Sequence, residues 1–214
     1  MRTAYIIGAG EYTGGAPRLA QGDLVICADG GYRTALCLGI PIDLAIGDFD
    51  SLGVLPSLPP ERIRRLPVEK DLTDTEAAIL EAEAMGATRL VLLGCTGGRP
   101  DHTLAAQQLL VAIAERGKEG YLVGDGFVVT ALRRGRVCFS PAASGTISVF
   151  AVGGEASGVT IEGLKYCVRD RLLSPAAPLG VSNSFVGGEA SVSVSDGTLL
   201  LFMEGESVRE MKRV

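Results

Sequence analysis

Short apolar segments alternate with helical segments through the first half of the chain, and this alternation constrains the fold more than any other feature. The expected strands are residues 4–7, 24–28, 44–47 and 89–93, with 62–66 as a further candidate. The expected helices are residues 32–38, 73–85 and a long segment ending near Arg116. Strands that alternate with helices are typical of a mostly parallel sheet covered by helices. The first half therefore predicts an α/β domain.

The pattern changes near Gly117. Beyond it we expect seven short strands, at residues 119–123, 127–132, 136–139, 146–151, 157–161, 189–195 and 198–204. Asp125-Gly126 and Asp196-Gly197 are typical of tight hairpin turns between such strands. A run of short strands without a helical pattern indicates an antiparallel, sandwich-like fold. We therefore expect an α/β domain over residues 1–117 and an all-β, sandwich-like domain over residues 118–214.

Composition argues against several functional classes. The net charge is −5 and lysine and arginine form no large cluster, which disfavours nucleic acid as a partner. No apolar run approaches the ~20 residues that a membrane span requires. The five cysteines are scattered without a Cys-x-x-Cys pair, and there is one histidine. This pattern disfavours disulfides and zinc, and it favours a reduced, cytoplasmic protein.

Two carboxylates follow the expected strand 44–47. Asp48 and Asp50 are separated by one residue, so in an extended segment their side chains point the same way, about 7 Å apart at Cα. Two negative charges at this spacing repel unless a cation or a proton lies between them. Mg²⁺ prefers a few carboxylates together with substrate phosphate oxygens. We predict a divalent-metal site here; the alternative is a solvated turn capped by Ser51.

A second acidic pair, Asp71 and Asp74, lies at the start of the expected helix 73–85. Thr73 and Glu76 have capping-box spacing, which predicts Thr73 as the N-cap. Asp74 then lies in the first helical turn, where the helix dipole favours a negative charge. Two interpretations stay open: Asp74 only stabilises the helix, or Asp71 and Asp74 join Asp48 and Asp50 around one metal.

Three loops contain glycines that would allow a ligand close to the backbone. Asp29-Gly30-Gly31 follows the strand 24–28 and suits a ribose or a phosphate, with a plain strand-to-helix turn as the alternative. The glycines at 8–10 follow the first strand but lack the dinucleotide-binding spacing, so they carry little weight. The loop 94–102 joins small residues to Arg99, whose guanidinium can make a forked contact to phosphate oxygens.

The last residues of the loop 94–102 also have a simpler, structural interpretation. Asp101 follows Pro100 and could cap the next helix, and His102 could be an ordinary surface residue. The chain has no Gly-x-x-x-x-Gly-Lys-Ser/Thr segment, so it is not a P-loop enzyme. Phosphoryl chemistry without that loop depends on metal ions and cationic groups to hold the charge in line.

Taken together, the motifs resemble those of the thiamine pyrophosphokinase (thiamine diphosphokinase) family. The matching segments are residues 29–31, 47–51, 70–77, 97–102, 163–166 and 182–184. They occur in order and at suitable intervals from Asp29 to about Phe202. The resemblance implies transfer of a pyrophosphoryl group from ATP to the hydroxyethyl oxygen of thiamine, giving thiamine diphosphate and AMP. It also implies Mg²⁺, an α/β domain followed by a β-sandwich domain for thiamine binding and dimerisation, and a homodimer with active sites between subunits.

The same resemblance implies roles for individual residues. The metal ligands are Asp48, Asp50 and Asp74, and the catalytic set adds Asp71, Arg99 and Asp101. The nucleotide-binding residues are Asp29, Gly30, Gly31, Ser51, Thr75, Thr96, Gly97, Gly98, Arg99 and His102. Thiamine contacts Tyr166, Ser182 and Asn183, with the tyrosine ring stacked on it and the Ser-Asn pair hydrogen-bonded to its aminopyrimidine. The chain departs from the family pattern in having no tryptophan at the aromatic position and no acidic residue directly after Ser182-Asn183.

Two other functions fit parts of the sequence. A phosphohydrolase would use Asp48 as nucleophile and Asp50 as acid, but that class places its pair after the first strand, and the loop 97–102 would have no role. A regulator that binds a nucleotide or thiamine without turnover would gain little from four crowded carboxylates. The sequence therefore predicts a thiamine diphosphokinase.

Overall fold

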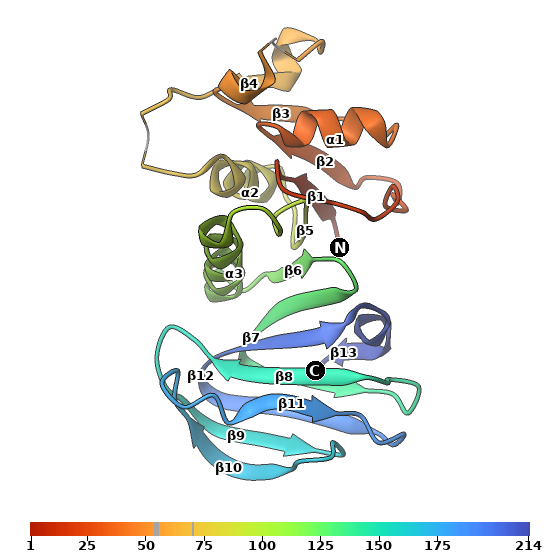
Figure 1. The fold of residues 1–214 in the computed structure, drawn as a ribbon, viewed down its shortest axis with the longest axis vertical. Coiled ribbons are helices and arrows are strands. Elements are labelled where there is room, and N and C mark those ends of the chain that lie inside the picture. The colour runs from red at the N-terminus through yellow and green to blue at the C-terminus, as the bar shows by residue number, and fades with distance from the viewer. Residues whose placement is uncertain (54–55, 70) are drawn as a thin grey trace. The chain divides into compact units, whose positions relative to one another are not determined.

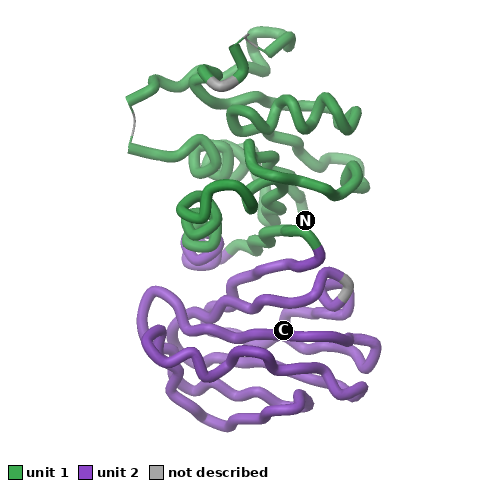
Figure 2. Tube along the Cα trace, viewed as in Figure 1, with its two compact units in different colours: residues 1–109, 118–125 green, residues 110–117, 126–214 purple. Residues whose placement is uncertain are grey.

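The structure is a computed structural model and describes residues 1–53, 56–69 and 71–214. Contacts between Cα atoms divide the chain into two compact units (Figure 2). The first unit comprises residues 1–109 and 118–125, and the second comprises residues 110–117 and 126–214. Each unit contains buried apolar side chains of its own.

A parallel sheet forms the centre of the first unit (Figure 1). Its strands are β1 (Thr3–Ile7), β2 (Leu24–Ala28), β3 (Leu44–Gly47), β4 (Ile63–Arg65), β5 (Arg89–Leu93) and β6 (Glu119–Val123). They lie in the order β6-β5-β1-β2-β3-β4, and each neighbouring pair is parallel. Because parallel strands all point the same way, the loops after β1, β2, β3 and β5 emerge at one edge of the sheet. The predicted α/β architecture is confirmed.

The helices of this unit are α1 (Gly31–Cys37), α2 (Asp74–Ala84) and α3 (Pro100–Glu115), with short 3₁₀ turns η1 (Asp50–Leu52) and η2 (Pro60–Arg62). The Thr73 hydroxyl accepts a hydrogen bond from the Glu76 backbone N–H at 3.1 Å, so the predicted N-cap of α2 is confirmed. Among the helices described, none is long and apolar enough to cross a membrane.

Antiparallel strands form the second unit. They are β7 (Phe127–Phe139), β8 (Thr146–Ala151), β9 (Ala156–Glu162), β10 (Val168–Leu173), β11 (Gly180–Ser184), β12 (Ala190–Glu204) and β13 (Met211–Arg213), with a 3₁₀ turn η3 (Gly205–Glu210). The long strand β12 pairs with β7 along its length, with β9 near its start and with β8 near its end. Side chains such as Val137, Ile147, Val159 and Leu201 fill the core. The β-rich second part is therefore confirmed, but the strand expected at residues 119–123 is wrongly placed there, because it pairs in parallel with β5 as β6 of the first unit.

The hairpin expected at Asp196-Gly197 is wrong. Both residues lie inside β12, where the register against β7 shifts between Val194 and Thr198. Gly197 has φ +93°, a conformation that glycine adopts without strain. The extra residues form a bulge instead of a turn because β12 has partner strands before and after it. An exposed ion pair joins Asp196 to Arg134 on β7 at 2.8 Å across this bulge.

Candidate active site

A cavity of about 650 Å³ opens at the carboxyl ends of β1, β2 and β5. The chain runs from β1 outward to β4 and then places β5 on the other side of β1, so the strand order reverses between β1 and β5. Open α/β sheets bind ligands at such a switch point. All of the residues that line this cavity belong to the first unit.

Two glycine-containing loops form one wall of the cavity. The loop after β1 contributes Gly8–Glu11, and the loop after β5 contributes Gly94, Cys95, Gly97 and Gly98. The Gly10 N–H donates to the Gly94 carbonyl at 2.7 Å, and a Cβ on Gly10 would lie only 2.6 Å from the Thr96 carbonyl oxygen. Glycine is therefore needed for the two loops to approach each other. The spacing of the glycines at 8–10 did not predict this role, and the position of the loop after the first strand was the available signal.

The opposite walls come from α2 and α3. Thr73, Asp74 and Thr75 at the start of α2 line the cavity, where the helix N-terminus favours negative charge. Apolar side chains line another part, namely Val68, Leu72, Ala105, Ala106 and Leu109. The cavity thus has a polar, glycine-rich part suited to phosphates and an apolar part suited to a flat organic ring.

Arg99 and His102 also line the cavity, and a neighbouring carboxylate orients the arginine. Asp101 accepts two hydrogen bonds from Arg99, with Nε–Oδ1 at 3.2 Å and Nη2–Oδ2 at 2.5 Å. The hydrogen bond from Arg99 lowers the pKa of Asp101, so this carboxyl group stays ionised. Asp101 itself is not among the lining residues, so its contact with Arg99 is its connection to the cavity.

An acidic group lies at the edge of the cavity. Carboxylate oxygens of Asp29, Asp48 and Asp50 all lie within 4.8 Å of one another. Oxygens on opposite sides of a bound Mg²⁺ are about 4.2 Å apart, so the spacing and the hard oxygen donors fit this ion. Asp29 also lines the cavity, and this connects the acidic group to the glycine-rich loops. The motif resemblance predicted Asp29 as a nucleotide-binding residue and did not group it with Asp48 and Asp50.

The loop that carries Asp48 and Asp50 is anchored by the residue between them. Phe49 has φ +62° and is 4% exposed, packed in the same core as Tyr32 and Leu52. Burial of its ring directs the flanking carboxylates away from the core. The Asp50 N–H also donates to Asp48 Oδ1 at 3.1 Å, so Asp48 stabilises the turn in addition to presenting a carboxylate.

Helix α1 holds the same loop at two points. Arg33 Nη2 donates to the Leu52 carbonyl at 2.8 Å, and the Ser57 N–H donates to the Tyr32 hydroxyl at 2.9 Å. Since α1 begins two residues after Asp29, these contacts connect both halves of the acidic group.

The remaining predicted residues of this unit occupy different positions. Thr75, Gly97 and Gly98 line the cavity, and Thr96 is buried in the loop after β5, where its carbonyl accepts the Glu11 N–H. Gly30 and Gly31 join Asp29 to α1. Asp74 lines the cavity outside the acidic group, and Asp71 is exposed and belongs to neither set. The side chain of Ser51 lies outside the described part of the structure.

A cysteine also lines the cavity. Burial raises the pKa of the Cys95 thiol to about 12, and the thiol donates to the Leu93 carbonyl at 3.4 Å. A thiol with this pKa is uncharged at neutral pH and is a poor nucleophile. Cys95 therefore contributes shape to the cavity and offers no thiolate for covalent catalysis.

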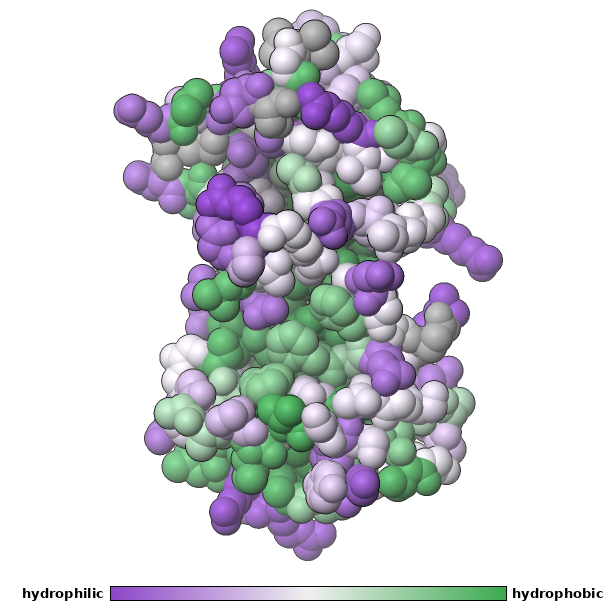
Figure 3. All heavy atoms as spheres, viewed as in Figure 1, coloured by the Kyte–Doolittle hydropathy of each residue, from purple (hydrophilic) through white to green (hydrophobic). Residues whose placement is uncertain are grey.

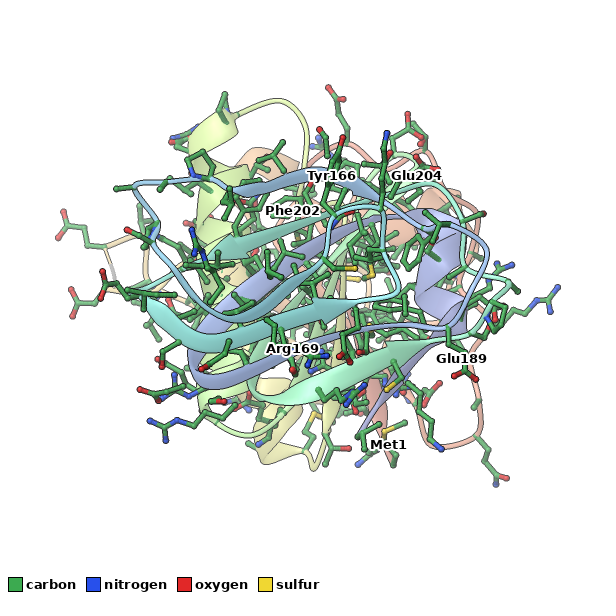
Figure 4. The ribbon with its side chains drawn as sticks, turned by 90° about the horizontal axis from the view of Figure 1, so that it is seen from below. Met1, Tyr166, Arg169, Glu189, Phe202 and Glu204 are labelled. Atoms are coloured by element: carbon green, nitrogen blue, oxygen red, sulfur yellow. The ribbon has the colours of Figure 1, made fainter. Side chains whose placement is uncertain are left out.

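The three residues predicted to contact thiamine lie close together in the second unit. Tyr166 is 59% exposed and its side chain lies at the edge of the unit in Figure 4. Ser182 is exposed on β11 with φ +56°, and its backbone N–H donates to the Ser148 hydroxyl at 3.0 Å. Asn183 is only 3% exposed, and its carboxamide bonds to the backbone of Tyr166.

Two family models match the chain over most of its length. Residues 17–122 match the catalytic domain of thiamin pyrophosphokinase, and residues 138–199 match its vitamin B1 binding domain. The chain belongs to the thiamin pyrophosphokinase family. The resemblance found in the motifs is thereby confirmed, and so is the activity it predicted, thiamine diphosphokinase with ATP as the co-substrate. These matches give no support to a phosphohydrolase or to a regulator without turnover.

Solved structures agree with this family. Thiamin pyrophosphokinase from Geobacillus thermodenitrificans is 26% identical, with a TM-score of 0.75 over 97% of this chain and 99% of that one. The Bacillus subtilis thiamine pyrophosphokinase (TM-score 0.79, 23% identity, 94% and 98% covered) has the same fold. The yeast thiamin pyrophosphokinase (TM-score 0.69, 16% identity, 95% and 86% covered) does as well. No match was found among curated protein sequences.

Proposed function

We propose that the chain binds ATP in the cavity of the first unit and holds Mg²⁺ with Asp29, Asp48 and Asp50 during pyrophosphoryl transfer to thiamine. The hydroxyethyl oxygen of thiamine attacks the β-phosphorus of ATP and its proton passes to the solvent. The bond from that phosphorus to the oxygen retained by AMP breaks, and AMP leaves with the electron pair. The observation that carries this assignment is the position of Asp29, which belongs to the acidic group and also lines the cavity. The carboxyl ends of β2 and β3 thus present the metal ligands, and those of β1 and β5, at the same edge of the sheet, present the phosphate-binding loops.

Each part of the site has a proposed task. The bound metal would neutralise phosphate charge and so favour attack by the hydroxyl oxygen. Backbone N–H groups of the loop after β5 and the N–H groups of Arg99 that Asp101 does not occupy hold phosphate oxygens, with Asp101 fixing the orientation of the arginine. Asp74, and the neighbouring Asp71, complete the proposed catalytic set, and Asp74 lines the cavity. The apolar wall that includes Leu72 and Leu109 would receive the nucleotide base.

The second part of the chain supplies the thiamine site, with functional domains at residues 1–117 and 118–214 apart from β6, which belongs to the sheet of the first unit. The ring of Tyr166 is available to stack on the flat, cationic substrate because more than half of its surface is exposed. We place the enzyme in the cytoplasm as a homodimer with active sites between subunits. Large exposed hydrophobic side chains of this unit support such pairing; they are Tyr166, Leu172, Leu179, Val181 and Val186. Figure 3 shows hydrophobic side chains gathered on one face of the second unit.

Product analysis tests the reaction. Purified protein with thiamine, ATP and Mg²⁺ is expected to release AMP and thiamine diphosphate in equal amounts, because one pyrophosphoryl group leaves each ATP. Chelation of the metal should stop the reaction, and added Mg²⁺ should restore it. ADP together with thiamine monophosphate would mean that the γ-phosphorus is attacked. Thiamine-independent phosphate release would instead indicate a hydrolase.

Tyr166 is the residue to test for thiamine recognition. A Tyr166→Ala variant is expected to raise the KM for thiamine about tenfold and leave the KM for ATP nearly unchanged, since it removes the stacking surface and, besides that, only the contact of the ring with Lys165 Nζ, 5.4 Å from its centroid. Tyr166→Phe keeps the ring and should retain most of the affinity. Initial rates with each substrate varied in turn provide the measurement. A larger effect on the ATP requirement would contradict the assignment.

A further inference from the structure

The side chain of Asn183, the only asparagine in the chain, is bound on both sides of its carboxamide. Its Oδ1 accepts hydrogen bonds from the backbone N–H of Tyr166 and from that of Ser184, each at 2.9 Å. Its Nδ2 donates to the Tyr166 carbonyl at 2.7 Å. The carboxamide therefore pairs with both backbone groups of Tyr166, as a peptide group of a neighbouring strand would.

This side-chain pairing continues a short backbone ladder. Leu164 and Phe185 form an isolated antiparallel bridge, and the Lys165 N–H donates to the Ser184 carbonyl at 3.0 Å. Tyr166 comes next along the chain, and there the Asn183 carboxamide takes the place of a backbone partner. Tyr166 lies outside the named strands, because β10 begins only at Val168. The position of the Tyr166 backbone therefore depends strongly on Asn183.

Asn183 is itself rigidly held, which makes it an effective anchor. It lies in β11, where it is paired with Ile147 of β8. Close by, the Phe185 ring packs edge-on against Phe139, with centroids 5.0 Å apart. An anchor set in a paired strand can fix a loop residue to the accuracy that ring stacking demands.

We propose that Asn183 is a positioning residue that promotes thiamine binding through Tyr166 and makes no contact with thiamine itself. This inference depends on the proposed stacking role of Tyr166. Both acceptor sites of Asn183 Oδ1 and one of its two N–H donors are already used, and the side chain is 3% exposed. The Tyr166 ring, in contrast, is 59% exposed and is the group available to a ligand.

A double-mutant cycle distinguishes action through Tyr166 from direct contact. The proteins are wild type, Asn183→Ala, Tyr166→Ala and the double variant, and the dissociation constants for thiamine and for ATP with Mg²⁺ are measured by titration calorimetry. We expect Asn183→Ala to weaken thiamine binding about tenfold in the wild-type background, because the aromatic ring loses its fixed position. In the Tyr166→Ala background the same change should have less than about a twofold effect, and ATP binding should be unchanged in all four proteins.

Two further variants separate this effect from general damage to the fold. Thr198→Ala truncates another buried polar residue of the second unit, also 3% exposed, and should leave the thiamine dissociation constant unchanged. Asn183→Asp keeps the acceptor oxygens for the two N–H groups but cannot donate to the Tyr166 carbonyl, and it serves in the cycle if the alanine variant is unstable. We expect it to weaken thiamine binding only when Tyr166 is present.

Each other outcome has a definite meaning. An equal loss of thiamine affinity in both backgrounds would show direct contact and overturn the proposal. No loss on Asn183→Ala in the wild-type background would overturn it as well. If Tyr166→Ala alone leaves thiamine binding unchanged, the proposed stacking role of Tyr166 fails, and the role of Asn183 fails with it. The Tyr166→Ala variant alone therefore tests the stacking role of Tyr166, and the Asn183→Ala variant tests the positioning role of Asn183.

Discussion

An Asp50→Asn variant is expected to fold normally and to lose about a thousandfold in kcat. Asp50 is exposed and contributes one of the three clustered carboxylates, and asparagine keeps the size while removing the charge that a divalent ion requires. A thousandfold loss corresponds to about 4 kcal/mol of lost transition-state stabilisation, the order found when one electrostatic group is removed from a preorganised site. The melting temperature should stay the same or rise slightly, because one source of repulsion has been removed.

Asp50 is a better target than Asp48 because its substitution removes a carboxylate without removing a hydrogen bond of the turn. Asp48 accepts the Asp50 N–H, so changing it would also disturb the turn. Asp170→Asn, on β10 of the second unit, makes the same change of charge far from the acidic group in sequence and should retain full activity. Steady-state rates and thermal unfolding of the three proteins provide the data. Near-normal turnover by Asp50→Asn would remove Asp50 from the metal site.

The second large effect is expected on stability, from Gly31→Ala at the start of α1. An added Cβ would lie 1.9 Å from the Ile7 carbonyl oxygen and 2.5 Å from its carbon. Both are backbone atoms of β1, so no side-chain rotation relieves the overlap and the helix must move away from the strand. We expect a loss of about 3 kcal/mol in the free energy of unfolding, which lowers the melting temperature by about 6–12 °C for a chain of this size. Activity should fall too, since α1 also holds the acidic loop.

Gly15→Ala is the matched control for that change. A Cβ on Gly15 meets no atom within 4 Å, so the substitution should change stability by about 1 kcal/mol at most, and in the stabilising direction. Calorimetric or fluorescence-detected melting of both variants against the parent makes the comparison. Equal melting temperatures for Gly31→Ala and the parent would show that α1 and β1 separate without cost.

Local signals were sufficient to predict most of the first unit. Each of its buried strands is a short apolar run, and the Thr73-Glu76 capping box marks the start of α2 directly. The second unit was predicted only in outline. Val168–Leu173 carries three charged residues and Gly180–Ser184 carries glycine, serine and asparagine, because both strands are largely exposed. Such strands form because neighbouring strands pair with them, and neither their composition nor an alternation of apolar and polar residues predicts them.

The candidate site shows the same limit. Asp48 and Asp50 could be grouped from their spacing, but the extended segment expected for them is wrong, because Phe49 has φ +62° and Asp50 begins the turn η1. Asp29 joins them only because β2 lies beside β3. The loop at Gly8–Glu11 has an unremarkable spacing and becomes a cavity wall only through its contacts with the loop after β5. Likewise, no spacing in the sequence predicts that the Asn183 carboxamide pairs with the Tyr166 backbone. In each case the missing information was a contact between residues far apart in the chain.

The separation of the two hydrophobic cores has an evolutionary consequence. The cavity and acidic group are built on the core that includes Ile7 and Phe49, whereas Tyr166 and Asn183 lie on the unit whose core includes Val137 and Leu201. Under the proposed assignment of these residues, substitutions that reshape the acceptor side can accumulate without disturbing the donor chemistry. A lineage with this architecture can explore new acceptor alcohols while its phosphate-handling machinery stays under unchanged selection.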